Sequence, residues 1–231
     1  MKIQPLLAEF LGTFFFCFAG IAAILSATPS IGSGAGIIGI ALAHSLALSV
    51  AVNAFGGISG AHFNPAVSCA FFLTGRLPLT SLGPYIMVQL LGGTTAAFLC
   101  RAIFPVEAVV QAQLGIPLPA PWATPGVILL TEFIMTFLLM TAIFGTAVDP
   151  RGQAMKIGGF GIGLTVAFNI LAGGAVTGAS MNPARSFGPA LVMGNFSFHW
   201  LYWVGAIAGA CVGAMFYERA LLGYPVPDLK T

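Results

Sequence analysis

The sequence predicts an all-α membrane protein, with six transmembrane helices plus two re-entrant half-helices arranged as an inverted repeat. Three observations predict this fold: the composition, the spacing of the apolar runs, and motifs that occur in both halves. Of the 231 residues, 58% are hydrophobic and only 6% are charged, whereas about a quarter of the residues in a soluble domain are charged. The mean hydropathy of +0.99 indicates that lipid surrounds most of the chain. The net charge of +2 is too small and scattered for a nucleic-acid partner.

The apolar runs place the spans. Each transmembrane helix needs about 20 apolar residues. Runs of this kind predict spans near residues 5–27, 36–57, 82–104, 126–147, 157–173 and 198–222. The first run is too long for the apolar region of a signal peptide, and it is matched later in the chain. We therefore expect one transmembrane channel domain over residues 1–231 and no large soluble domain.

Two segments of the first half return in the second half. Residues 8–14, which contain Glu9, resemble residues 131–137, which contain Glu132, and residues 58–68 resemble residues 176–186. We expect repeat 1 over about 1–104, a linking loop over 105–125, and repeat 2 over about 126–231. Because each half has an odd number of spans, the second half must be inverted relative to the first. Repeats of this kind place their site near the membrane midplane, where broken helices meet.

Basic residues predict the orientation. In a six-span scheme, six of them fall on one side of the membrane: Lys2, Arg76, Arg151, Lys156, Arg219 and Lys230. Only Arg101 falls near the other side, and Arg185 lies inside the second repeated motif. The positive-inside rule then places both termini in the cytoplasm. We expect a multi-pass protein of the cell (inner) membrane.

Each half contains a short apolar stretch of about ten residues that begins with an Asn-Pro-Ala (NPA) motif, 64–73 and 182–192. Ten helical residues rise about 15 Å, half of the hydrocarbon core. Asn is a favoured N-cap and Pro is favoured at the first helical position, so each motif predicts the start of a half-helix. The predicted midplane consists of Asn64, Pro65, Ala66, Asn182, Pro183 and Ala184.

Two half-helices that meet there offer amide donors to a neutral oxygen and bring positive N-terminal dipoles that repel cations. A water molecule that points its oxygen at both Asn side chains is badly oriented to pass a proton onward. The backbone before each Asn cannot be helical, so its carbonyls should line the pore and accept from moving water. These residues are Gly60, Ala61, His62, Phe63, Gly178, Ala179, Ser180 and Met181.

These motifs resemble the major intrinsic proteins, the aquaporins, over essentially the whole chain. The segment 178–190 is close to the family signature, and so is 199–205. The resemblance implies the aquaporin fold, one pore per subunit and a homotetramer in the lipid bilayer. It implies a passive channel for water that excludes ions and protons, and not an enzyme.

The family builds a narrow constriction from four positions, which fall here on His44, Ile170, Ala179 and Arg185. A basic residue at pore depth is costly, which favours a functional role for Arg185. This set resembles the plant vacuolar-membrane (tonoplast) branch, so ammonia and hydrogen peroxide are further candidate solutes. Glycerol channels of the family usually carry Asp where this chain has Ser186, so this position favours water. A glycerol facilitator is the alternative.

The resemblance assigns Glu9 and Glu132 to bracing the loops before the Asn motifs; a proton relay is the alternative reading of membrane acids. A coupled secondary transporter also uses inverted repeats and broken helices, but should place ionisable groups along its pathway. A structural junction protein would need long outer loops, and only the 105–125 segment offers one. The four cysteines match no metal-site spacing, so we expect no metal and no cofactor.

Overall fold

The computed structural model describes residues 2–32 and 36–223, so Lys230, one of the basic residues used to orient the chain, lies outside the described part. Within that part, six helices are long and apolar enough to cross a membrane. They are α1 (Ile3–Ser26), α2 (Gly36–Ser59), α4 (Leu79–Ile103), α6 (Pro125–Ile143), α8 (Gly158–Thr177) and α10 (His199–Phe216). No strand occurs among the described residues, and the all-α membrane fold is confirmed.

The half-helices are α3 (Pro65–Leu73) and α9 (Pro183–Met193). Both begin within a residue of the predicted start, because Asn64 and Asn182 cap them and Pro follows each cap. The fifth span is longer than predicted. Its helix α8 continues to Thr177, where Gly178 ends it in a left-handed conformation with φ +80°.

Shorter elements fill the connections. The sequence predicted only a linking loop over 105–125. In the structure this segment contains α5 (Val106–Gln111) and the 3₁₀ turn η1 (Gln113–Gly115). Helices α6 and α10 continue as π-helical turns, η2 (Phe144–Val148) and η3 (Tyr217–Leu222). The short helix α7 (Pro150–Gln153) follows η2.

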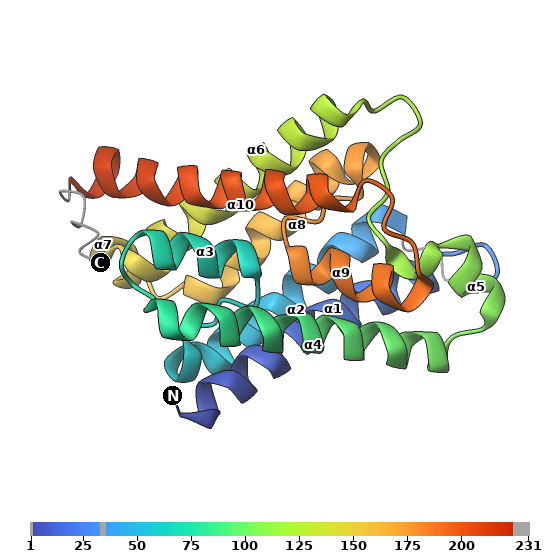
Figure 1. Ribbon diagram of the computed structural model, residues 1–231, viewed down its shortest axis with the longest axis horizontal. Helices are drawn as coiled ribbons and strands as arrows, with labels where there is room; N and C mark the ends of the chain where they lie inside the picture. Colours follow the sequence, from blue (N-terminus) through green and yellow to red (C-terminus); the bar gives the residue numbers. More distant parts are fainter. Residues whose placement is uncertain (1, 33–35, 224–231) are drawn as a thin grey trace.

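The half-helices exchange partners between the two halves. Helix α3 of the first half packs mainly against α10, and α9 of the second half packs mainly against α4. Figure 1 shows α3 and α9 end to end between α10 and α4. Helices α2 and α8 pack against each other across the two halves, while α1 packs on α4 and α6 on α10. The interior therefore mixes both halves.

Small residues allow this close packing. A Cβ at Gly93 of α4 would lie 2.6 Å from the Ala184 carbonyl oxygen of α9, and one at Gly188 of α9 would overlap the Gly93 carbonyl. The two helices can approach at this crossing only because neither carries a side chain there.

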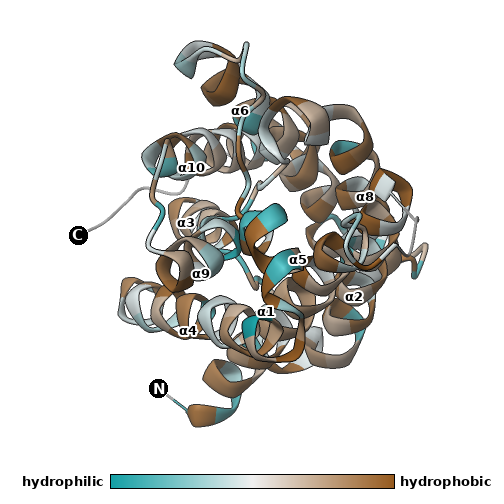
Figure 2. Cartoon of the chain, turned by 90° about the vertical axis from the view of Figure 1, so that its right-hand side faces the viewer, coloured by the Kyte–Doolittle hydropathy of each residue, from teal (hydrophilic) through white to brown (hydrophobic). Residues whose placement is uncertain are grey.

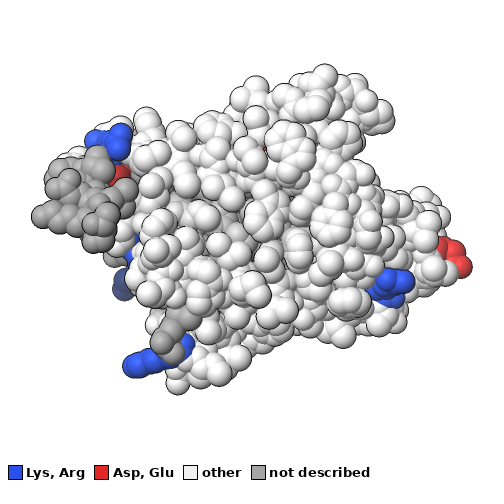
Figure 3. Space-filling model, viewed as in Figure 1, with Lys and Arg blue, Asp and Glu red and all other residues white. Residues whose placement is uncertain are grey.

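The outer surface is apolar along the length of the helices. Ile38 is 64% exposed and Leu130 is 59% exposed, as are many other large apolar residues that a soluble protein would bury. Figure 2 shows the largely apolar helices from one end. On the face in Figure 3, a wide uncharged band separates basic side chains at one end from a small charged group at the other. This surface suits a lipid bilayer.

Candidate functional site

The two Asn motifs start the half-helices in the same way. The Asn64 side-chain oxygen accepts from Ala66 N at 2.9 Å, and the Asn182 oxygen accepts from Ala184 N at 2.9 Å and Arg185 N at 3.4 Å. Both Asn side chains are 4% exposed. Since the oxygens face the helix N-termini, the amide nitrogens point away from their own helices.

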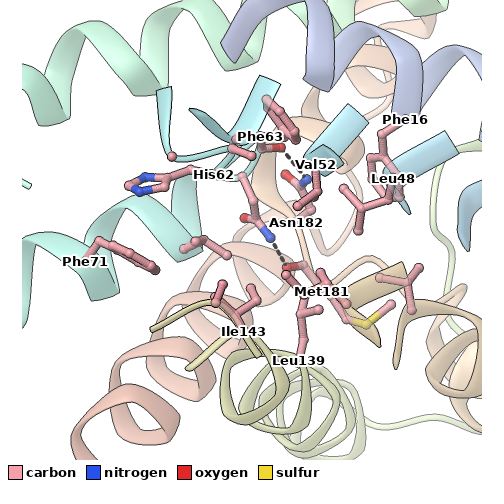
Figure 4. Close-up of a pocket in the computed structure, with 18 of the residues that line it drawn as sticks. Phe16, Leu48, Val52, His62, Phe63, Phe71, Leu139, Ile143, Met181 and Asn182 are labelled. Carbon is pink, nitrogen blue, oxygen red and sulfur yellow. Dashed lines mark hydrogen bonds between the residues drawn. The ribbon is translucent and has the colours of Figure 1, made fainter. Parts of the chain in front are cut away.

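Each amide reaches the loop of the opposite half. Asn64 Nδ2 donates to the Met181 carbonyl at 2.8 Å, and Asn182 Nδ2 donates to the Phe63 carbonyl at 2.9 Å. Figure 4 draws both bonds beside the cavity that the two loops line. The capping argument alone left both amide nitrogens free. In the structure each of them already makes one hydrogen bond. An amide has two N–H donors, so one on each Asn remains for another acceptor.

Glu9 holds the loop before Asn64. Its Oε1 accepts from Ser59 Oγ at 2.6 Å and His62 N at 3.0 Å. Its Oε2 accepts from Phe63 N at 2.7 Å and Gln89 Nε2 at 2.8 Å. Four donors around a fully buried carboxylate compensate its loss of water.

Glu132 holds the loop before Asn182 in the same way. Its Oε1 accepts from Thr177 Oγ1 at 2.7 Å and Ser180 N at 3.0 Å, and its Oε2 accepts from Met181 N at 2.7 Å. Neither acid lines either of the two cavities described below. Both acids therefore lie on the side of the loops that faces away from the cavities.

The loop backbones follow matching paths. Gly60, Ala61 and Phe63 have positive φ angles in the first loop, and Gly178, Ala179 and Met181 have them in the second. The amide N–H groups at 62–63 and 180–181 point to the glutamates, so the carbonyls of these extended segments turn away from them. Ala61, Phe63, Ala179 and Met181 adopt this left-handed conformation although it is unfavourable without glycine.

Two cavities approach the Asn motifs from opposite ends of the molecule. The near cavity, on the side of η2, has a volume of about 330 Å³ and is lined by both Asn side chains together with mainly apolar residues. Six of the predicted carbonyl residues line it: Gly60, Ala61, His62, Phe63, Ser180 and Met181. The far cavity, on the other side, has a volume of about 370 Å³ and is lined by Gly178 and Ala179.

The four predicted constriction residues all line the far cavity: His44, Ile170, Ala179 and Arg185. All four are at most 4% exposed. By contrast Pro65, Ala66, Pro183 and Ala184 are buried at the helix starts and line neither cavity. They shape the half-helices, while the Asn side chains face the near cavity.

Arg185 is held from one side. One terminal guanidinium nitrogen donates to the Gly115 carbonyl at 2.8 Å, and Nε has no partner among the described residues. His44 Nδ1 lies 2.9 Å from the Ile40 carbonyl. Because only an N–H can donate to a carbonyl, Nδ1 carries the proton and Nε2 of the neutral ring is an acceptor. The far cavity thus has a fixed cation and a ring acceptor in its wall.

Sequence reasoning missed several supporting groups. Ser59 and Thr177 connect the glutamates to the loops, and their matched positions in the two motifs were the available signal. Tyr85 and Tyr202 donate to the carbonyls of those same two residues at 2.9 and 2.7 Å. The Gly115 carbonyl had no sequence signal, because it depends on the path of the 105–125 segment.

Comparison with known proteins agrees with this architecture. The family model described as "MIP: Major intrinsic protein" matches residues 1–217. Aquaporin TIP4-4 of Zea mays is 40% identical over 222 residues, covering 94% of this chain and 86% of the relative. Probable aquaporin TIP1-1 of Oryza sativa subsp. japonica is 39% identical over 234 residues, covering 99% and 91%. The aquaglyceroporin structure from Plasmodium falciparum superposes with a TM-score of 0.85 at 21% identity, covering 96% and 97%, which shows a shared fold.

Spanning helices around two opposed half-helices, with cavities that approach from both ends, define a multi-pass membrane channel. Within that class the family is established by the match over nearly the whole length. The chain belongs to the major intrinsic protein family.

Proposed function

We propose that this protein is a passive channel for water. The observation that carries the proposal is the pair of Asn caps, each with one amide N–H left after its bond to the opposite loop. Both side chains line the near cavity where the two half-helices begin. Water is small enough to reach this point and has an oxygen that accepts from both amides.

Cations are disfavoured at the same point. Each half-helix N-terminus contributes roughly half a positive charge, and the Asn side chains add donors but no carboxylate. A cation would lose its hydration water there without gaining negative ligands. A water that accepts from both Asn amides has its lone pairs occupied, which interrupts proton transfer along the file.

His44, Ile170, Ala179 and Arg185 are proposed as the selectivity filter. The support is that all four line the far cavity, with a fixed guanidinium in one wall. Ile170 and Ala179 add no polar groups, so the opening suits small neutral solutes. Ammonia and hydrogen peroxide are the further solutes we propose. Glycerol remains the alternative, and Ser186, buried and bonded to the Pro183 carbonyl, argues against it.

The acids argue against a coupled transporter. Glu9 and Glu132 are occupied by loop donors and line neither cavity. A third acid in a spanning segment, Glu218, pairs with Arg76 and also lines neither cavity. Members of the family are channels rather than enzymes. The proposed mechanism needs no cofactor and no metal.

The whole chain, 1–231, is proposed as one channel domain of two inverted repeats, since each half-helix packs on the other half. We propose a homotetramer in the cell membrane with both termini in the cytoplasm. Maleimide labelling of Lys2→Cys and Glu107→Cys in sealed cells tests the orientation, because the two sites should be accessible from opposite sides.

Stopped-flow measurements on reconstituted vesicles test the function, with water, glycerol and ammonia in parallel. We expect water flux with a low activation energy that persists when a proton gradient is collapsed. Ile170→Trp should close the path, while its neighbour Leu171→Trp, on a side chain 50% exposed at the outer surface, should conduct normally. Water flux equal to that of empty vesicles, or flux that needs a proton gradient, would overturn the proposal.

A further inference from the structure

Gly20 of α1 lies directly against the His44 ring of α2. Gly20 is buried. The three nearest heavy atoms to a Cβ built on Gly20 are Nε2, Cε1 and Cδ2 of His44, and such a Cβ would overlap the ring. The missing side chain therefore creates a recess in α1 that the imidazole occupies.

The ring is confined on its other sides. Its Nδ1 is bound to the Ile40 carbonyl at 2.9 Å. Phe16, one helical turn before Gly20 on α1, meets the ring edge-to-face with centroids 5.2 Å apart. The space that remains is the far cavity, which His44 shares with Ile170 and Arg185.

We infer that Gly20 is a positioning residue that sets the width of the constriction, because its recess keeps the His44 imidazole withdrawn from the water path. A methyl group at position 20 displaces the ring toward Ile170 and Arg185, since Phe16 and the Ile40 carbonyl block the alternatives. Overpacked sites respond by such side-chain shifts. This inference rests on the proposed water channel and adds a residue that contacts no solute.

A double-variant cycle tests it in reconstituted vesicles at matched protein density. Gly20→Ala should lower water permeability about fivefold, because flux through a single file depends steeply on pore diameter. His44→Ala removes the ring that Gly20→Ala displaces. The double variant should therefore conduct within about twofold of His44→Ala alone.

Gly173→Ala on α8 is the matched control. Its nearest neighbours would be Sδ and Cε of Met135, the flexible end of a side chain outside both cavities. It should keep wild-type permeability.

Each outcome decides the question. Unchanged permeability in Gly20→Ala overturns the inference, and so do losses that multiply in the double variant, which would indicate helix packing unrelated to His44. If Gly20→Ala fails to fold, the double variant should fold, and its failure would overturn the inference too. If the wild-type vesicles conduct no water, the proposed function fails instead.

Discussion

The loop before Asn64 and the loop before Asn182 follow the same backbone path but are held by different numbers of donors. Glu9 accepts from four groups and Glu132 from three. The fourth donor of the first half is Gln89, four residues after Tyr85. In the second half, the residue four after Tyr202 is the buried Ala206. The comparison shows that three bonds suffice to hold such a loop.

The halves also differ directly after the Asn motifs. The first continues with Val67, which lines the near cavity, and the second with Arg185, which lines the far cavity. One approach to the midplane is therefore apolar beside its half-helix, and the other carries a fixed cation. The inverted repeat builds a symmetric midplane, and in the proposed channel this difference between Val67 and Arg185 would make the far side the one that discriminates between solutes.

The largest effect should come from making the second motif match the first. Arg185→Val removes the fixed charge and a donor from the far cavity, so larger neutral solutes lose a barrier. Glycerol permeability should rise about tenfold, which corresponds to roughly 1.4 kcal/mol of barrier. Proton leak should rise only partly, because the Asn64 and Asn182 barrier remains.

Vesicle swelling in glycerol and a pH-sensitive dye inside the vesicles measure the two effects. Val67→Ala, beside the near cavity, is the matched control and should leave glycerol passage unchanged. Equal glycerol passage in wild type and Arg185→Val would remove Arg185 from the filter.

A stability difference should follow from the fourth donor. Gln89→Leu removes the Gln89 bonds to Glu9 at 2.8 Å and to Ser68 at 2.9 Å. A bond to a buried charge contributes about 1.5–3 kcal/mol, so we expect destabilisation of about 2 kcal/mol. Thermal unfolding in detergent measures it, with Ala206→Ser as the second-half control, expected near wild type. If Gln89→Leu unfolds at the wild-type temperature, the first loop is as well held by three donors as the second.

The two tyrosines offer a conservative comparison. Tyr202 donates to Thr177 O at 2.7 Å in a buried site, and Tyr85 donates to Ser59 O at 2.9 Å in a partly buried site. Loss of the hydroxyl leaves a carbonyl unpaired, which costs about 1–3 kcal/mol when it is buried. Tyr202→Phe should therefore destabilise by about 1.5 kcal/mol and Tyr85→Phe by about half as much. A larger drop in the denaturation midpoint for Tyr85→Phe than for Tyr202→Phe would contradict this ranking of the two hydroxyl bonds.

The spans and half-helix starts were predictable because their signals are local. Asn64 and Asn182 as caps, Pro at the next position, and apolar runs of membrane length each act within a few residues. The support for Arg185 was not predictable, because the Gly115 carbonyl reaches it only after Gln113 and Leu114 adopt positive φ angles. Loop conformations without glycine at such positions depend on tertiary contacts rather than on sequence propensity.

The bonds between each Asn amide and the opposite loop were missed for a related reason. The sequence predicted that both amides face one point at the midplane, but the capping rule specifies only the partner of the side-chain oxygen and leaves the partner of the amide nitrogen open. Each bond from an Asn amide nitrogen to the opposite loop joins residues more than a hundred positions apart. Only the head-to-head placement of α3 and α9 brings them together, and that is a property of the assembled fold.

The smallest effect should appear in the connections between the first two spans of each half. The connection after α6 contains Asp149, which caps α7 and pairs with the Arg151 guanidinium at 2.6 Å, whereas residues 28–32 after α1 have no charge. The hydrogen bonds from Arg151 lower the pKa of the Asp149 carboxyl to about 2 from its usual 3.8. Because the folded-state pKa is lowered, this stabilisation is present above about pH 4 and is lost as pH falls toward 2.

Hydrogen exchange by mass spectrometry, corrected for intrinsic rates, should show amides near 149–153 losing protection between pH 4 and 2. Amides at 28–32 are the internal control and should show no such step, since their connection has no titrating group. Asp149→Asn keeps the capping oxygen but cannot form the ion pair, so its protection should be lower at neutral pH and flat across this range. An identical pH profile in wild type and Asp149→Asn would mean that the carboxylate does not order this connection. The two connections would then differ in sequence but not in what holds them.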